Sequence, residues 1–222
     1  MLSLSLFLQF AFVFSALKSK KKIYNVNVLV SLEYLTLYEQ THSSLGTDLM
    51  SIALALQTAF NNSTMAKSNG YEIEFELFTP LDSPFIPKMS PSICEGSVTN
   101  ILNLLNEVNR FDNTHHYILL LPCMPETYSE IFNSVGVNVP IIDYSTVVEC
   151  SKRVAMFFEP SYPQLFSSFS NSLLKIINAP PYDFNTITEN SIGDDGLKTS
   201  ITINDNTVFN VLNSKCFLNT KG

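Results

Sequence analysis

The sequence predicts an α/β fold in which helices cover a mostly parallel, twisted sheet. Segments with the apolar pattern of strands alternate along the chain with segments of helical period, and this order typically builds a parallel sheet. Hydrophobic residues make up 45% of the 222 residues, which is enough for a sizeable core. No internal repeat or second domain is visible, so we expect a single domain over residues 23–222.

The first half of the chain predicts a strand, a helix and a second strand. Residues 25–33 (NVNVLVSLE) place alternate valines on one face, which indicates a strand. Residues 47–60 carry apolar side chains at helical spacing, and residues 61–70 are expected to form a polar loop. Residues 71–78 (YEIEFELF) alternate strictly, so their three glutamates share one face, which we interpret as a solvated strand face.

The second half continues the alternation. A helical stripe over 98–108 precedes an uninterrupted apolar run at 117–121, which is typical of a central strand. Residues 124–146 are expected to be irregular. The remaining predicted elements are a strand over 153–158, a helix over 162–178, a weak strand over 199–203 and a short helix over 206–212.

The N-terminus has the character of a removable leader. Residues 2–17 (LSLSLFLQFAFVFSAL) are almost continuously apolar, which suits a signal-peptide core and is short for a membrane span. We therefore expect a signal peptide over residues 1–19, a secreted or lumenal location and no membrane span in the mature chain. An uncleaved anchor, flanked by the lysines that follow, is the alternative.

The charge balance excludes one class of partner. The formal net charge is −7, and the one basic run lies beside the leader at residues 18–22. Binding to a phosphate backbone needs clustered Lys and Arg, so we expect no nucleic-acid partner.

Cysteine usage agrees with secretion. The even count of four favours two disulfides in an oxidising compartment, and the absence of a C-x-x-C spacing gives no support to a zinc knuckle or a redox motif. The tetrapeptide NNST contains two overlapping N-glycosylation sequons. Asn61 or Asn62 is therefore an expected glycan acceptor.

Several stretches, taken in order, resemble a known family. They are residues 25–37, the helix at 47–60, the strand at 71–78, the tetrapeptide Cys150-Ser151-Lys152-Arg153 before a strand and a long helix, and the segment 212–219 around Cys216. Together they resemble the catalytic domain of the reprolysin-type (ADAM, adamalysin) metzincin metalloproteases. A different secreted α/β fold with two disulfides is the alternative.

The resemblance carries structural expectations. It implies a metzincin-like sandwich whose sheet has one antiparallel edge strand, which we place near residues 147–150. In the family, the cysteines matching Cys150 and Cys216 are joined to each other. That pairing leaves Cys94 and Cys123 to form the second disulfide.

The zinc motif of the family is missing. Metzincins bind zinc with H-E-x-x-H-x-x-G-x-x-H, in which the glutamate acts on the zinc-bound water. Aligning the helices places Asn171 and Ser172 at the His-Glu pair, Lys175 at the second histidine and Pro181 at the third. Asparagine is a poor zinc ligand, a protonated lysine repels the ion, and serine cannot replace the carboxylate. We therefore expect no zinc and no other cofactor.

Other catalytic combinations have little support. The chain has three histidines, His42, His115 and His116, so no H-E-x-x-H exists in any register. Neighbouring residues of a strand face opposite sides, which argues against joint metal binding by His115 and His116. A Ser172/Lys175 dyad lacks further support, because no G-x-S-x-G turn is present.

The face of the long helix around Asn171 is polar, and we expect it to border water or a polar cleft. A cleft beside an edge strand could bind extended peptides by strand addition without zinc. The sequence thus favours a secreted, catalytically inactive metalloprotease-like domain that binds a protein or peptide partner. The alternative is a hydrolase of the metzincin family with unorthodox activity, and a structural coat protein would differ from the first hypothesis only in its partner.

Overall fold

The protein is described here from a computed structural model. The described residues are 20–42, 44–89, 94–112, 115–125, 141–144, 153–158, 161–177, 201 and 203–214. The expected signal peptide, Cys150, Cys216 and Pro181 lie outside these residues. No helix in the described part of the chain is long and apolar enough to cross a membrane.

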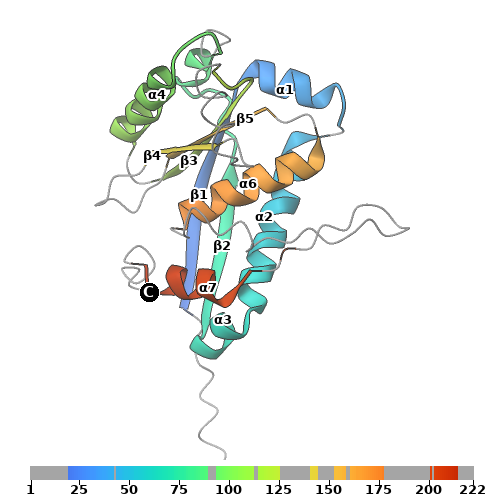
Figure 1. The fold of residues 1–222 in the computed structure, drawn as a ribbon, viewed down its shortest axis with the longest axis vertical. Coiled ribbons are helices and arrows are strands. Elements are labelled where there is room, and N and C mark those ends of the chain that lie inside the picture. Colours follow the sequence, from blue (N-terminus) through green and yellow to red (C-terminus); the bar gives the residue numbers. More distant parts are fainter. Residues whose placement is uncertain are drawn as a thin grey trace, which may run out of the picture.

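The core of the fold is a five-stranded sheet in the order β2-β1-β3-β5-β4 (Figure 1). Four strands run parallel, and β4 at one edge is antiparallel to its neighbour β5. The predicted mostly parallel α/β sheet with one antiparallel edge strand is therefore confirmed. The strands are β1 (Lys20–Val30), β2 (Tyr71–Phe78), β3 (His116–Leu121), β4 (Ile141–Tyr144) and β5 (Arg153–Phe157).

Helices cover both faces of the sheet. One face is packed by α1 (Leu32–Glu39), α2 (Leu45–Asn62) and α6 (Tyr162–Ile176), whose apolar side chains join those of Tyr24, Val26 and Val28. The opposite face is packed by α4 (Val98–Phe111) against alternate residues of β3 and β5. Each helix thus buries the apolar stripe that its sequence period predicts.

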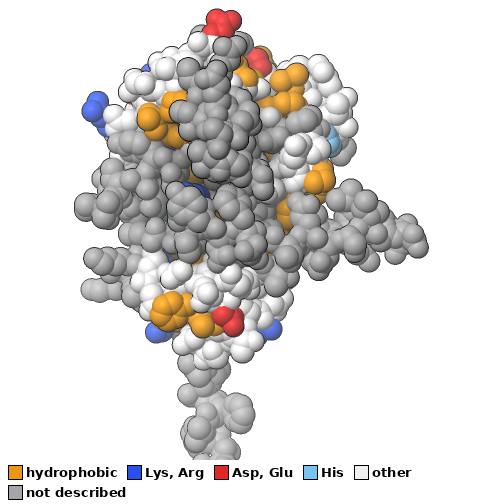
Figure 2. All heavy atoms as spheres, in the orientation of Figure 1, with side chains coloured by type: hydrophobic (Ala, Val, Ile, Leu, Met, Phe, Trp, Pro, Cys, Tyr) orange, Lys and Arg blue, Asp and Glu red, His pale blue; other side chains and the backbone are white. Residues whose placement is uncertain are grey.

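Two short helices meet at the lower end of the molecule in Figure 1. Helix α3 (Thr64–Asn69) contacts α7 (Asp205–Leu212) near the amino end of β2. Hydrophobic side chains also reach the surface in separate groups on the face shown in Figure 2. Exposed examples are Leu32 on α1, Phe111 on α4 and Phe209 on α7.

The sequence prediction was wrong at residues 61–70, which are mostly helical. Ser63 ends α2 and its hydroxyl accepts from the N–H of Ala66 at 3.1 Å, which caps α3. Gly70 then ends α3 in the left-handed conformation, with φ of 64°. The polar composition of this segment reflects helix capping rather than a loop.

The predicted borders of β1 were also wrong, and the segment predicted to be irregular contains the edge strand. The first strand begins at Lys20 and ends at Val30, because the hydroxyl of buried Ser31 accepts from the N–H of Tyr34 at 3.1 Å and starts α1. The antiparallel edge strand is Ile141–Tyr144, inside the segment predicted to be irregular, while residues 147–150 lie outside the described chain. Residues 201 and 203 are not in a strand.

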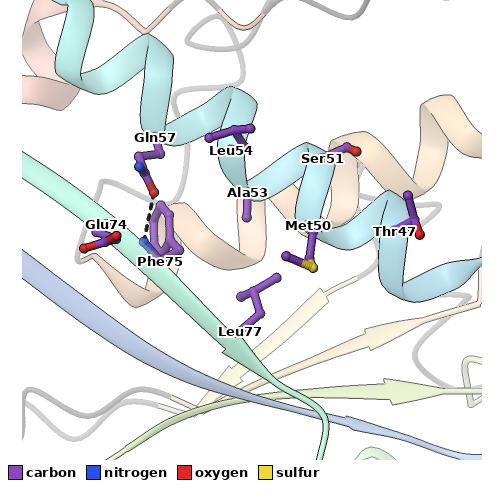
Figure 3. Close-up of a pocket in the computed structure, with 9 residues that line it drawn as sticks. All are labelled: Thr47, Met50, Ser51, Ala53, Leu54, Gln57, Glu74, Phe75 and Leu77. Carbon is purple, nitrogen blue, oxygen red and sulfur yellow. Dashed lines mark hydrogen bonds between the residues drawn. The ribbon is translucent and has the colours of Figure 1, made fainter.

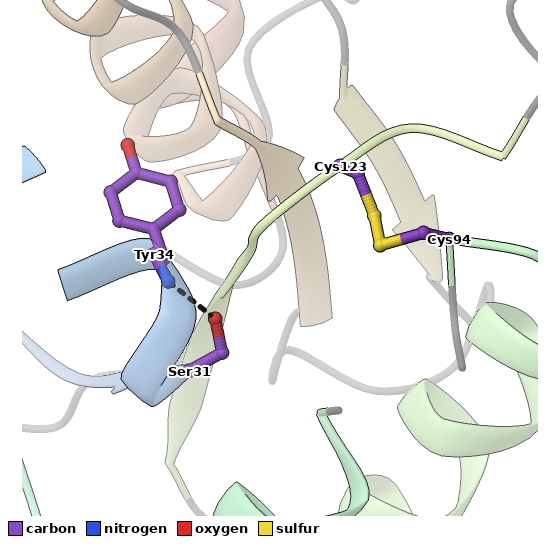
Figure 4. The surroundings of a disulfide bond; sticks show 4 residues. All are labelled: Ser31, Tyr34, Cys94 and Cys123. Atoms are coloured by element: carbon purple, nitrogen blue, oxygen red, sulfur yellow. Dashed lines mark hydrogen bonds between the residues drawn. A yellow bond between two sulfur atoms is a disulfide. The ribbon is translucent and has the colours of Figure 1, made fainter. Parts of the chain in front are cut away.

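A disulfide joins Cys94 to Cys123, with 5.3 Å between their Cα atoms (Figure 4). This is the pairing that the resemblance left for these two cysteines. It ties the segment before α4 to the residues that follow β3, 29 positions later. The disulfide therefore closes a covalent loop that contains α4 and β3.

The outer edge of β2 is partly paired by side chains of α2. The amide of Asn61 donates from Nδ2 to the carbonyl of Ile73 and accepts at Oδ1 from the N–H of the same residue, both at 2.9 Å. One helical turn earlier, Gln57 Oε1 accepts from the N–H of Phe75 at 3.2 Å (Figure 3). These two amides take the place of a neighbouring strand along the first half of the edge.

This arrangement also makes the acceptor asparagines of the two sequons differ in accessibility. The Asn61 amide is hydrogen-bonded at both of its ends, whereas Asn62 is exposed. The geometry thus favours Asn62 over Asn61 as an acceptor, and the use of either sequon stays a prediction.

We expect Asn61→Ala to lower the free energy of unfolding by about 1–3 kcal/mol, because two backbone groups of Ile73 lose their partner. The neighbouring exposed residue gives the matched control: Asn62→Ala should stay within about 0.5 kcal/mol of the unmodified protein. Urea unfolding followed by circular dichroism measures both. Equal stability of the two variants would contradict a structural role for the Asn61 amide.

Candidate functional site

Three positions aligned with the zinc motif, Asn171, Ser172 and Lys175, lie on α6, which packs on β5 and against α2. Ser161 caps the helix through a hydrogen bond from the N–H of Gln164. The apolar residues predicted to form one stripe, Leu165, Phe169, Leu173 and Ile176, are all buried. The helix is therefore held firmly on the sheet by its apolar side.

The polar side of α6 differs from the expectation. Gln164 is exposed and Asn171 and Lys175 are half-buried, but Ser168 and Ser172 are buried, with Ser172 fully inaccessible. The sequence predicted that this face borders water or a polar cleft; Gln164, Asn171 and Lys175 are accessible, whereas Ser168 is buried. Helical periodicity places these residues on one side, but it does not show how far neighbouring elements cover that side.

Two of the aligned residues donate hydrogen bonds to backbone carbonyls of their own helix. Ser172 Oγ donates to the carbonyl of Ser168 at 2.9 Å, and Asn171 Nδ2 donates to the carbonyl of Ser167 at 2.8 Å. Both are bonds to the preceding turn of the same helix. Ser172 and Asn171 are thus oriented along the helix backbone rather than toward a reactant.

The donor set at these positions does not fit a zinc ion. Asn171, Ser172 and Lys175 offer an amide, a hydroxyl and an amine, and the expected third histidine position, Pro181, offers no donor in its side chain. Among the described residues, no group of three or more His, Cys, Asp or Glu side chains is placed to hold a metal ion.

We expect Ser172→Glu to destabilise the protein by several kcal/mol, since it would bury a carboxylate at a fully inaccessible position. Ser172→Ala should cost only about 1 kcal/mol, because it removes one hydrogen bond within the helix. Thermal and urea unfolding of the two variants measure the difference. A well-folded S172E protein would show instead that this position opens to solvent.

A buried polar cluster that the sequence analysis missed lies at the amino ends of β3 and β5. Arg153 is fully buried, and its guanidinium donates to the backbone carbonyls of Asp112 and His115. It also stacks on the ring of Tyr117, 4.6 Å from the ring centre. Arg153 therefore fastens the turn between α4 and β3 to the start of β5.

The Asp112 carboxylate organises the outer part of this cluster. Its Oδ2 lies 2.6 Å from His115 Nδ1 and 2.9 Å from the hydroxyl of Tyr117, both of which donate to it. Burial, and then the hydrogen bond to Asp112, raise the pKa of Tyr117. His115 faces this carboxylate while His116 is buried beside Tyr24, so the two histidines do not share a site.

The sequence held one signal for this cluster. Arg153 is a charged residue at the start of a strand that is otherwise apolar, and such a residue needs buried partners. Its partners are backbone carbonyls about 40 residues away along the chain, which no local pattern identifies.

We expect Arg153→Met to lower the free energy of unfolding by about 3–5 kcal/mol, because two partly buried carbonyls lose their donor. The exposed Arg110 on α4 gives the matched control, and Arg110→Met should change stability by less than about 0.5 kcal/mol. Chemical denaturation measures both. A small effect of R153M would show that the turn is held by other contacts.

His42 lies in the turn that follows α1. Its ring stacks on Tyr38 with 4.4 Å between ring centres, and Nδ1 lies 2.7 Å from the hydroxyl of Thr41. Tyr38 in turn donates to Asp48 at 2.7 Å, which connects α1 to α2. His42 therefore belongs to the packing of these two helices.

Comparison with known proteins identifies the family. Residues 23–217 match the family described as "MICSWaP: Spore wall protein". The chain belongs to this family. The reprolysin resemblance is thereby corrected, because the match over nearly the whole expected domain is to spore wall proteins and not to the ADAM family.

A curated relative points the same way. The "Spore wall protein ECU02_0150" of Encephalitozoon cuniculi (strain GB-M1) is 34% identical over 84 residues. This match covers 38% of the chain and 38% of that relative, so the two are alike over less than half of either length.

One solved structure gives a distant likeness. It is metalloproteinase-II from Bacteroides fragilis, with 12% identity and a TM-score of 0.44 over 92% of this chain and 58% of that one. A likeness of this size assigns no activity to the chain.

Proposed function

We propose that this protein is a secreted, non-catalytic component of the spore wall that acts by binding other wall polypeptides. Membership of the spore wall protein family supports the location, and the apolar leader supports secretion. We further propose that residues 1–19 are removed and that residues 23–222 form the working domain.

One observation carries the non-catalytic part of the proposal. Asn171, aligned with the first metal ligand, and Ser172, aligned with the general base, both donate hydrogen bonds to their own helix, and Ser172 is fully buried. A general base must reach the proton that it removes, and a zinc ligand must direct a lone pair at the ion. Asn171 and Ser172 do neither.

The proposed role requires a stable surface rather than a reactive centre. The described helices bury their apolar stripes on both faces of one sheet, and the Cys94–Cys123 disulfide adds a covalent restraint. A disulfide constrains the unfolded chain in an oxidising compartment, which suits a protein that persists outside the cell.

We expect the purified, secreted full chain to contain substoichiometric zinc and to leave casein uncleaved, with no change on adding zinc or a chelator. Elemental analysis and a fluorescent casein assay measure these properties, with an active zinc metalloprotease as the positive control. Stoichiometric zinc together with chelator-sensitive cleavage would favour the hydrolase alternative.

The same protein should be retained on washed spore walls, whereas a secreted control protein of similar size and charge should be washed away. Failure to be retained would contradict the binding role, whatever the result for zinc.

A further inference from the structure

An open groove of about 440 Å³ lies between α2 and the outer edge of β2 (Figure 3). It lies at the sheet edge opposite to the antiparallel strand β4. Its lining is mainly apolar, and Met50 and Leu54 on α2 are 67% and 61% exposed beside it. In Figure 3, Met50 and Leu77 point toward one another across this groove.

Within the described chain, part of the β2 backbone beside the groove is open for pairing. The N–H groups of Ile73 and Phe75 point away from β1, because they donate to Asn61 and Gln57 on α2. By the period of two, the N–H and carbonyl of Leu77 point the same way. Within the described chain, the hydrogen bonds from α2 to this edge stop at the N–H of Phe75.

The charges beside this edge have one sign. Glu72, Glu74 and Glu76 lie on the sheet face opposite to α2, and Glu72 and Glu76 are exposed. On the other side of β2, strand β1 supplies Lys21, which forms an ion pair with Glu74. This ion pair and the carboxyls of Glu72 and Glu76 raise the pKa of Lys21. Strand β1 thus shows that a basic side chain can pair with the glutamate row, and it places apolar Tyr24 and Val26 beside Phe75 and Leu77 on the face toward the helices.

A second copy of the chain does not suit this edge. Antiparallel pairing of two β2 strands would place both glutamate rows on the same face of the joined sheet. Like charges on opposed strands are destabilising, so the row acts against self-association.

We propose that the groove binds an extended polypeptide segment of a partner protein with the pattern apolar–basic–apolar. The segment adds to β2 at Phe75–Phe78. Its apolar side chains lie against Met50 and Leu54 on α2. Its basic side chain lies on the opposite face, beside Glu74 and Glu76. Backbone bonds at a strand edge supply affinity in such complexes, and alternate side chains supply specificity. This inference rests on the proposed binding role and names its surface.

The test uses the full chain and a fluorescein-labelled, acetylated peptide, Val-Lys-Val-Lys-Val, with binding followed by fluorescence anisotropy. A peptide of the same composition in the order Val-Val-Val-Lys-Lys controls for the pattern, and Val-Glu-Val-Glu-Val controls for the charge. We expect saturable binding of the first peptide and at least about tenfold weaker binding of the two controls. Bound peptide should also slow hydrogen exchange at the amide of Leu77.

Variants locate the site. The double variant Met50→Gln/Leu54→Gln should weaken binding about tenfold or more, since two apolar contacts are lost. Phe209→Gln on α7, an exposed apolar residue away from the groove, is the matched control and should bind normally. Glu76→Gln should weaken binding about two- to threefold at low salt, while Glu39→Gln on α1 should not. Circular dichroism checks that each variant is folded.

Equal binding of the three peptides, or undiminished binding by the folded M50Q/L54Q variant, would overturn the inference. Dimerisation of the free chain that M50Q/L54Q abolishes would also overturn it in favour of a second copy. Retention on spore walls separates the two proposals. If the unmodified chain and M50Q/L54Q are retained equally, the groove is not the surface that binds the wall, and the wall-binding role stands. If neither is retained while the peptide still binds at the groove, the wall-binding role fails instead.

Discussion

The handedness of parallel strand connections determines on which faces of the sheet α2 and α4 lie. Connections between parallel strands are almost always right-handed. From β1 the chain moves outward through α2 to β2, and it then returns past β1 through α4 to β3. Because these two connections run in opposite directions along the sheet, α2 and α4 must lie on opposite faces, as the two apolar clusters show.

The same constraint explains the surface beside β2. Helix α4 contacts β5 and β4 on its face, so the glutamate side of β2 remains exposed. On the other face α2 lies over β2 and reaches its edge with Gln57 and Asn61. The groove lies beyond the last of these contacts. Its position is thus a consequence of strand order as much as of the local sequence.

Much of the fold was predictable from the sequence, and the errors have physical causes. Strand β2 was predicted with its observed borders because one of its faces is apolar and the other is charged. Helix α3 was missed because Ser63 both ends one helix and caps the next, which resembles a loop in composition. The four-residue strand β4 is too short for a periodic signal. The loss of the zinc motif followed from composition alone, whereas the burial of Ser168 and Ser172 depends on neighbouring elements that periodicity does not describe.

The amide of Asn61 presents a donor and an acceptor to Ile73 as the backbone of a neighbouring strand would. Helix α2 therefore serves as a partial sixth strand, one that cannot be extended by further chains. In a crowded extracellular layer, an unpaired parallel edge would template the stacking of one molecule on another. Closing the first half of this edge with two side chains limits such growth.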